Sequence, residues 1–193
     1  MNALNTNQTP QMKNLFSDLG VTHVIALRHA KPESCEVLSV LSDESEEEVK
    51  RLAQLIKKHV TKGAGVVIVH SHEIKAFHTA TVLARVIDYE NTLTIGLLAL
   101  GDDEYHSGQI LMESLVQIVS GISSAIKAVI FVGHYEAIPG IIDAVSRSIG
   151  GCGLERFVPN FCDGCMAKIE TGTMIVHLRE HLEALEAGEP FVT

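Results

Sequence analysis

Aromatic residues are scarce in this sequence, which has no tryptophan, three tyrosines and six phenylalanines among 193 residues. Because hydrophobic residues still make up 46% of the chain, we expect a core built from aliphatic side chains. No apolar stretch approaches the ~20 residues of a membrane-spanning helix, which argues against a protein of the bilayer. The first residues also lack the basic segment and apolar run of a secretory signal peptide, so we expect a cytoplasmic protein.

Basic residues are outnumbered by acidic ones. The chain has 15 lysines and arginines against 24 aspartates and glutamates, and its formal net charge is −9. A chain without a basic surface is poorly suited to bind nucleic acids or anionic membranes, and we expect neither partner. An anionic small substrate would therefore need a local cluster of cations. The sequence does not indicate the oligomeric state.

The four cysteines, Cys35, Cys152, Cys162 and Cys165, do not make a disulfide framework in a chain of this size. Cys162 and Cys165 are separated by two residues, as in many zinc sites. No second paired ligand motif follows, and His177 falls on a predicted strand. We therefore favour reduced, partly buried thiols over a zinc cluster.

Strand-like and helix-like segments alternate along the chain. This alternation predicts an α/β protein, a three-layer α/β/α sandwich whose mostly parallel central sheet ends in an antiparallel C-terminal pair. Residues 1–21 are expected to form an arm with a short helix, and residues 22–193 a single domain. Ser45 and Glu48 have the spacing of a capping box. The predicted helices cover about Asp43–His59, Ile74–Asp88, Asp102–Ser120 and Pro139–Gly150. The first predicted strand ends near Leu27, and the second follows Gly65. The others cover Leu93–Leu97, Ala128–Val132, about Met166–Glu170 and about Met174–Leu178, and a turn at Thr171-Gly172 joins the last two.

Three hydrophobic runs end in histidine: Val24–His29, Val66–His72 and Val129–His134. Continuous β-branched runs of this kind are typical of buried parallel strands, whose carboxyl ends emerge at one edge of the sheet. That edge is where open α/β sheets bind ligands. The sequence therefore predicts a histidine-lined site.

Two kinds of site would use these histidines. Three histidines with one open position can bind zinc. Arg28 directly precedes His29, however, and Lys75 lies one helical turn beyond His72, so two cations would repel a divalent ion. The same cations favour phosphate, because a guanidinium matches its oxygens and the first turn of a helix attracts negative charge. A third interpretation, in which each histidine only ends a strand, suits a single histidine better than this set.

A phosphate site lined by histidines suits phosphoryl transfer. A neutral imidazole can attack phosphorus and hold the phosphoryl group covalently, which divides one difficult displacement into two easier ones. A second, protonated imidazole can stabilise the equatorial oxygens of the transition state.

Short motifs occur in an order that resembles one known family. Leu27–Ala30 (Leu-Arg-His-Ala) resembles the Arg-His-Gly/Ala signature of the histidine phosphatase (phosphoglycerate mutase-like) superfamily. Leu41-Ser42 resembles the family's next segment. Ser71–Ala80 resembles its Ser-Pro-x-x-Arg-Ala-x-x-Thr-Ala segment, and Val132–His134 its Gly-His segment. The resemblance covers about residues 22–178. The short length and Gly101-Asp102-Asp103 are most similar to the compact bacterial branch that includes phosphohistidine phosphatases.

The resemblance implies a phosphoglycerate mutase-like α/β sandwich and a phosphatase that uses neither a cofactor nor a metal. It implies that His29 is the nucleophile, that His134 is the second catalytic histidine, and that Arg28 binds phosphate. The family's second arginine is replaced by Lys75, which keeps the positive charge but loses the bidentate fork.

Other positions depart from the family pattern. His72 stands where proline is usual, and His70 and His78 add basic side chains nearby. His72 or His78 would assist phosphate binding when protonated, or else have a structural or solvated role. The general acid is also open, because Asp102 or Asp103 would either protonate the leaving oxygen or serve only as N-cap acids of a helix.

We therefore predict a phosphomonoester hydrolase that forms a phosphohistidine on His29. Its substrate would be a small phosphorylated molecule or a phosphohistidine protein. The alternative is a catalytically impaired relative that binds phosphorylated ligands or a protein partner, because Lys75 replaces the usual arginine. A mutase is disfavoured because the chain lacks the long insertions that shape a closed sugar-phosphate pocket. A metallohydrolase is the last alternative.

Overall fold

The structure is a computed structural model that describes residues 20–34, 39–61, 64–87, 92–97, 126–135, 137–149, 157 and 159–189. The short helix expected near Thr9, the helix expected over Asp102–Ser120, and Cys35 and Cys152 lie outside these residues. The division of the chain into an arm and a domain therefore stays a prediction. Within the described segments, no helix is both long enough and apolar enough to cross a membrane.

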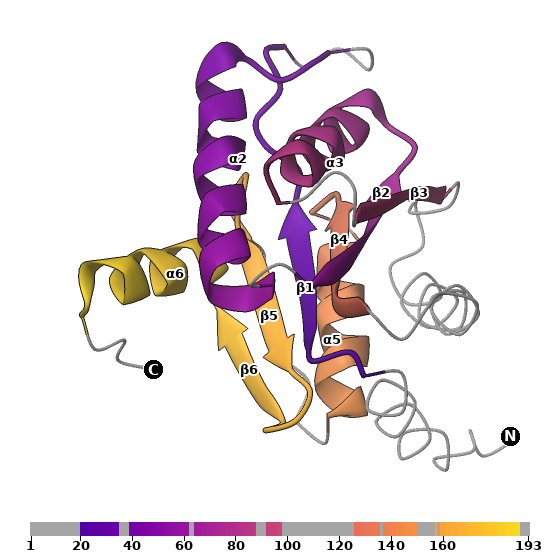
Figure 1. Ribbon diagram of the computed structural model, residues 1–193. Coiled ribbons are helices and arrows are strands. Elements are labelled where there is room, and N and C mark those ends of the chain that lie inside the picture. Colours follow the sequence, from indigo (N-terminus) through magenta and orange to yellow (C-terminus); the bar gives the residue numbers. More distant parts are fainter. Residues whose placement is uncertain are drawn as a thin grey trace, which may run out of the picture.

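A single sheet forms the centre of the described part of the chain (Figure 1). Its strands are β1 (His23–Arg28), β2 (Gly65–Ser71), β3 (Thr92–Leu97), β4 (Ile126–Gly133), β5 (Gly164–Lys168) and β6 (Thr173–Val176), in the spatial order β3-β2-β4-β1-β5-β6. Strands β3, β2, β4 and β1 run parallel, β5 runs antiparallel to β1, and β6 runs antiparallel to β5. The mostly parallel sheet and its antiparallel C-terminal pair are confirmed.

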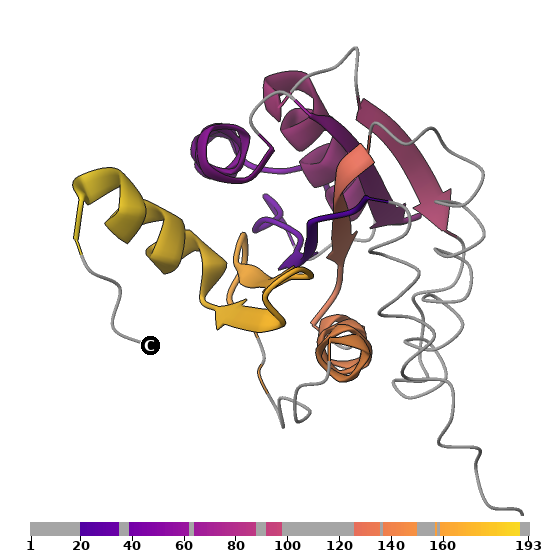
Figure 2. The same ribbon diagram turned by 60° about the horizontal axis from the view of Figure 1, so that its bottom comes forward.

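Helices cover both faces of the sheet (Figure 2). The described helices are α2 (Asp43–Ile56), which continues into a π-helical turn (Lys57–Thr61), α3 (Ile74–Ile87), α5 (Ile138–Ser148) and α6 (Leu178–Ala187). Leu52 of α2, Leu83 of α3 and Leu182 of α6 belong to one hydrophobic cluster. Ile141 of α5 and Phe131 of β4 belong to a second cluster on the opposite face. These layers confirm the predicted sandwich.

The strands are continuously hydrophobic because both of their faces are buried. In β1, Ile25 and Leu27 enter the cluster shared with α2 and α3, whereas Val24 and Ala26 enter the cluster shared with α5. Successive side chains of a strand point to opposite faces, so all four positions exclude water. The hydrophobic clusters on the two faces of the sheet therefore fix the position of β1 and of the residues at its carboxyl end.

Helix α2 begins at Asp43, where the sequence predicted it, but the capping box predicted at its start is wrong. The helix begins after Ser42, whose Oγ accepts a hydrogen bond from the Ser45 N–H at 3.2 Å, so the expected capping box of Ser45 and Glu48 does not form. Ser42 has extended backbone, as an N-cap requires, and the acidic first turn that follows it, with Asp43 at its start, suits the positive end of the helix dipole.

The end of the C-terminal hairpin also differs from the prediction. β6 stops at Val176, and His177 adopts left-handed backbone at φ 53° before α6 begins. Oδ1 of Asp163 accepts a hydrogen bond from the Arg179 N–H at 3.1 Å, so a carboxylate 16 residues away satisfies the start of this helix. The turn predicted at Thr171-Gly172 is present, with Gly172 at φ 65°, a conformation that glycine adopts without strain.

Candidate active site

The two histidines that follow β1 and β4 lie side by side. β1 and β4 are parallel neighbours with Arg28 opposite Gly133, and the His29 N–H donates to the Gly133 carbonyl at 2.9 Å. The ring centroids of His29 and His134 are 4.9 Å apart, with an interplanar angle of 62°. His29 is only 4% exposed and His134 only 6% exposed. Both rings therefore lie within reach of one phosphorus atom.

The neighbouring backbone holds the ring of His29 in one tautomer. Its Nδ1 lies 2.8 Å from the carbonyl oxygen of Ala30. A carbonyl oxygen can only accept, so Nδ1 carries the proton and Nε2 carries the lone pair. The Ala30 N–H donates to Oγ1 of Thr79 at 3.1 Å, which fixes this turn of backbone against α3. His29 thus presents an uncharged nitrogen nucleophile.

The charge state of His29 follows from its surroundings. Burial lowers the pKa of His29 from 6.5 to about 4, because the charged ring would lose its water. The hydrogen bond to Ala30 opposes this effect, whereas nearby His134, Lys75 and Arg28 lower the pKa further by charge repulsion. His29 is therefore neutral at physiological pH, the state that attack on phosphorus requires.

The lowered pKa of His29 predicts that acid destabilises the fold. Between pH 6.5 and about 4 the unfolded chain binds a proton at His29 that the folded chain does not, so falling pH favours the unfolded state. The free energy of unfolding should drop by up to roughly 3 kcal/mol over this window from His29 alone. Urea unfolding of wild type and His29→Asn at a series of pH values measures this drop as the difference between two profiles. Parallel profiles would contradict the prediction.

His134 contacts two side chains from the segment at the end of β2. Its Nε2 lies 2.7 Å from Oγ of Ser71 and 3.4 Å from Oε1 of Glu73. Ser71 is buried, and its Oγ also accepts the Glu73 N–H at 3.2 Å. This is not the arrangement of a serine hydrolase triad, in which serine and carboxylate contact opposite nitrogens of the histidine. Here both side chains contact the same nitrogen, Nε2 of His134.

Arg28 lies close to two aromatic rings beside His29. Its Cζ is 3.9 Å from the ring centroid of Phe161 and 5.4 Å from that of Tyr135, distances at which a guanidinium is attracted to a ring face. Nη1 donates to the Pro159 carbonyl at 3.3 Å. The Phe161 ring is also 5.5 Å from the His29 ring. The segment before β5 therefore positions both residues.

Lys75 lies in the first turn of α3 and forms an ion pair with Glu73, with Nζ 3.0 Å from Oε2. Burial raises the pKa of Glu73, but the hydrogen bond from Lys75 and the nearby charges outweigh it and hold this pKa below its ordinary value. Glu73 is thus ionised at neutral pH and contacts both Lys75 and His134. The structure brings together the four predicted residues, Arg28, His29, Lys75 and His134.

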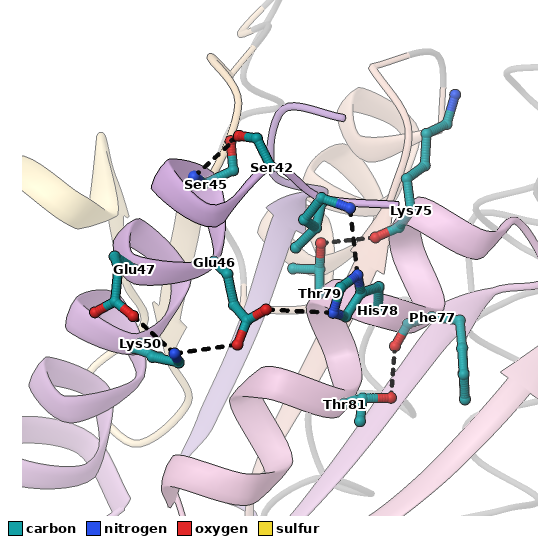
Figure 3. A network of polar contacts seen from close by, with 11 residues as sticks. Ser42, Ser45, Glu46, Glu47, Lys50, Lys75, Phe77, His78, Thr79 and Thr81 are labelled. Carbon is teal, nitrogen blue, oxygen red and sulfur yellow. Dashed lines mark hydrogen bonds and ion pairs between the residues drawn. The ribbon is translucent and has the colours of Figure 1, made fainter. Parts of the chain in front are cut away.

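His78 has a structural position. Its Nδ1 accepts the Leu41 N–H at 3.2 Å, and its Nε2 lies 3.7 Å from Oε2 of Glu46, so the ring links α3 to the start of α2. Figure 3 shows the Lys75 side chain extending away from His78, while the Lys75 carbonyl accepts a hydrogen bond from Thr79. The two side chains therefore face different surroundings, and His78 supports the scaffold of the site.

The other two histidines of the β2 segment differ in burial. His70 is buried, with Nδ1 2.7 Å from the Ser71 carbonyl and its ring 5.4 Å from that of Phe77. His72 is exposed. Of the histidines in the three runs, it is His134 whose ring packs against that of His29.

Cys162 and Cys165 belong to different cores. Cys162 lies in the cluster shared with α2 and α3, and Cys165 in the cluster shared with α5, so the sheet separates their thiols. Burial raises the pKa of each thiol to about 12, as befits unreactive core cysteines. Asp102 and Asp103 lie outside the described residues, so the assignment of the general acid stays a prediction.

Comparisons with known proteins bear on the fold. No family model and no curated protein sequence matches the chain. The solved structure of the protein histidine phosphatase SixA complexed with tungstate is similar, with a TM-score of 0.54 and 15% identity over 82% of this chain and 99% of that one. The chain has the histidine phosphatase fold. A mycobacterial glucosyl-3-phosphoglycerate phosphatase complexed with VO3 shares it (TM-score 0.52, 13% identity, 76% of this chain, 90% of that one). So does SixA from Agrobacterium tumefaciens (TM-score 0.51, 17% identity, 77% of this chain, 92% of that one).

The histidine phosphatase fold also brings to the site three residues to which the sequence analysis gave no role. Ser71 and Glu73 contact His134, and Phe161 contacts Arg28 and His29. The position of Ser71 at the end of a predicted strand was a usable signal, and Glu73 follows closely after it. Phe161 lies far along the chain in a segment without periodicity, so nothing in the sequence indicated its place.

Proposed function

We propose that the protein is a phosphomonoester phosphatase that uses neither a cofactor nor a metal and acts through a phosphohistidine on His29. The observation that carries this proposal is the neutral ring of His29, whose Nδ1 is bound to the Ala30 carbonyl at 2.8 Å and whose Nε2 carries the lone pair. The fold supports it, because the similar structures include named phosphatases, one in complex with tungstate and one with VO3. Tungstate is an oxyanion of the same tetrahedral shape as phosphate.

The reaction follows from this geometry in two steps. Nε2 of His29 attacks phosphorus, the bond from phosphorus to the leaving oxygen breaks, and that oxygen takes a proton to become an alcohol. Water then attacks the phosphohistidine and returns a proton to the group that protonated the leaving oxygen, the phosphorus–nitrogen bond breaks, and inorganic phosphate leaves. Arg28 and Lys75 neutralise the phosphoryl oxygens. When His134 is protonated, its Nε2 donates to Oγ of Ser71 at 2.7 Å, and the Ser71 hydroxyl donates to the phosphoryl oxygens as charge spreads in the transition state. Asp102 or Asp103 is the proposed proton donor.

The proposed substrate is a small phosphorylated molecule or a phosphohistidine protein, and the proposed location is the cytoplasm. The first test is hydrolysis of an aryl phosphate by wild type in the presence and absence of a strong chelator. The second is trapping of the phosphoenzyme, whose phosphate should be lost in acid and retained in alkali. We expect turnover that the chelator does not change. Loss of turnover on chelation would favour the metallohydrolase alternative, and absence of any turnover would contradict the proposal.

One observation favours a second candidate function, a catalytically impaired relative that binds phosphorylated ligands or a protein partner. Lys75 stands where the resembling family has arginine, and its Nζ is already paired with Glu73 at 3.0 Å. An ammonium cannot make the two parallel hydrogen bonds of a guanidinium. Phosphate would therefore be bound with less defined orientation.

Lys75→Arg distinguishes the two candidates. We expect the substitution to raise kcat/KM for an aryl phosphate about tenfold, because a guanidinium adds a bidentate contact to the phosphoryl group. Steady-state kinetics measures the effect, and Lys50→Arg on the outer surface of α2 is the matched control. Turnover that appears only in Lys75→Arg would support the impaired relative, whereas robust wild-type turnover excludes it. An unchanged or lower rate would show that the missing fork does not limit catalysis.

A further inference from the structure

We infer that Glu73 determines substrate specificity, by selecting against phosphate esters that carry a second negative charge on the leaving group and in favour of those whose leaving group is neutral or cationic. The inference rests on the proposed phosphatase function and names the class of substrate that the same site accepts. It comes from an unexpected feature, a carboxylate placed among the groups that would bind a phosphoryl dianion.

Glu73 is fixed at the site on two sides. Its Oε2 lies 3.0 Å from Nζ of Lys75, and its Oε1 lies 3.4 Å from Nε2 of His134. Its backbone is held as well, because its N–H donates to Ser71 Oγ at 3.2 Å and its carbonyl accepts the Phe77 N–H at 2.9 Å. The side chain is 32% exposed, so solvent reaches it as well as Lys75 and His134.

The charges of these residues explain why the carboxylate matters. At neutral pH Arg28 and Lys75 are positive, Glu73 is negative and the His29 ring is neutral. A bound phosphoryl dianion therefore cancels the positive charge that remains, even when His134 carries a proton as well. A further anionic group on the leaving side would then lie near Glu73 without a cation of this set to meet it. An ammonium group at the same place would be attracted.

The size of this effect is set by Coulomb's law. Two like charges several ångströms apart at a partly exposed site, with the effective dielectric of a protein surface, change affinity by about tenfold. The effect belongs to the charge of Glu73 and not to its shape. Glu73→Gln should therefore remove the discrimination, whereas Glu73→Asp should retain most of it.

The experiment uses three phenyl phosphates that differ only in the para substituent, which is methyl, carboxylate or aminomethyl. For each substrate, kcat/KM of a variant is divided by that of wild type, so differences in leaving-group reactivity cancel. In Glu73→Gln we expect this ratio to be about tenfold higher for the carboxylate ester than for the methyl ester, and lower for the aminomethyl ester. Glu73→Asp should keep the wild-type order. Glu47→Gln, whose side chain is 72% exposed on α2, is the control and should change none of the ratios.

The outcomes separate this inference from the proposed function. Wild-type turnover of the methyl ester tests the function, and equal ratios for all three esters in a folded Glu73→Gln variant would overturn the inference while leaving the function intact. If no ester is hydrolysed, calorimetric titration with the methyl and carboxylate esters still decides. An affinity for the carboxylate ester that rises about tenfold relative to that for the methyl ester in Glu73→Gln supports the role of Glu73, and an unchanged ratio of the two affinities overturns it. Thermal unfolding of each variant confirms that it is folded.

Discussion

Substitution of His29 by alanine is expected to lower kcat for aryl phosphate hydrolysis at least about 10³-fold and to abolish the trapped phosphoenzyme. The His29 ring offers one nitrogen with a lone pair, because its other nitrogen is bound to the Ala30 carbonyl at 2.8 Å. The second buried histidine cannot readily replace it, since Nε2 of His134 is already 2.7 Å from Oγ of Ser71. Steady-state kinetics and quantitative phosphate trapping measure the two effects.

His72→Ala is the matched control for this prediction. His72 comes from the segment that supplies Ser71 and Glu73, but its side chain is exposed. Its removal should leave kcat within about twofold of wild type, as for a surface substitution away from the chemistry. Equal rates for wild type and a folded His29→Ala variant would remove His29 from the mechanism.

Gly164→Ala is expected to reduce the free energy of unfolding by about 3 kcal/mol or more. Gly164 begins β5 opposite Leu27 of β1, and a Cβ at this position would lie 1.8 Å from the carbonyl oxygen of Ala26 and 2.8 Å from its carbonyl carbon. These are backbone atoms of a strand buried between two cores, so they cannot move aside as the end of a flexible side chain could. Urea unfolding measures the loss. Activity should fall with the folded fraction because β1 carries His29.

Gly188→Ala provides the contrast. Gly188 ends α6 at φ 73° and would meet nothing within 4 Å of an added Cβ, so its substitution costs only the strain of a left-handed backbone, about 1 kcal/mol. The ratio of the two losses tests whether close backbone approach makes Gly164 necessary. A Gly164→Ala variant with the same urea midpoint as wild type would contradict this close approach of β5 to β1.

The elements of the fold were predictable because their signals are local. Apolar runs such as Val66–Val69 are continuous because both faces of the sheet are buried, and amphipathic segments such as Asp43–Ile56 cover it. Boundaries were less predictable where the decisive partner is remote. Asp163 completes the start of α6 from another part of the chain, so no local pattern could show that the last strand stops at Val176.

The sequence predicted which residues belong to the candidate site, but it did not predict which of them contact one another. Parallel strands end at the same edge, so histidines that follow such strands were expected there, with Arg28 and Lys75 favouring an anion over a metal. Whether His70, His72 or His134 would meet His29 was not determined by spacing. It depends on strand order, and β4 lies directly beside β1.

The sequence by itself determined the alternation of strands and helices, the buried character of the strands, and the set of basic and imidazole side chains at one edge, because periodicity and residue chemistry act over short distances. The tertiary structure alone decided that His29 and His134 lie 4.9 Å apart, that the Ala30 carbonyl sets the tautomer of His29, and that Glu73 lies against Lys75. Those contacts join residues from different strands and loops. Such contacts exist only once the packing of both cores has fixed the order of the strands.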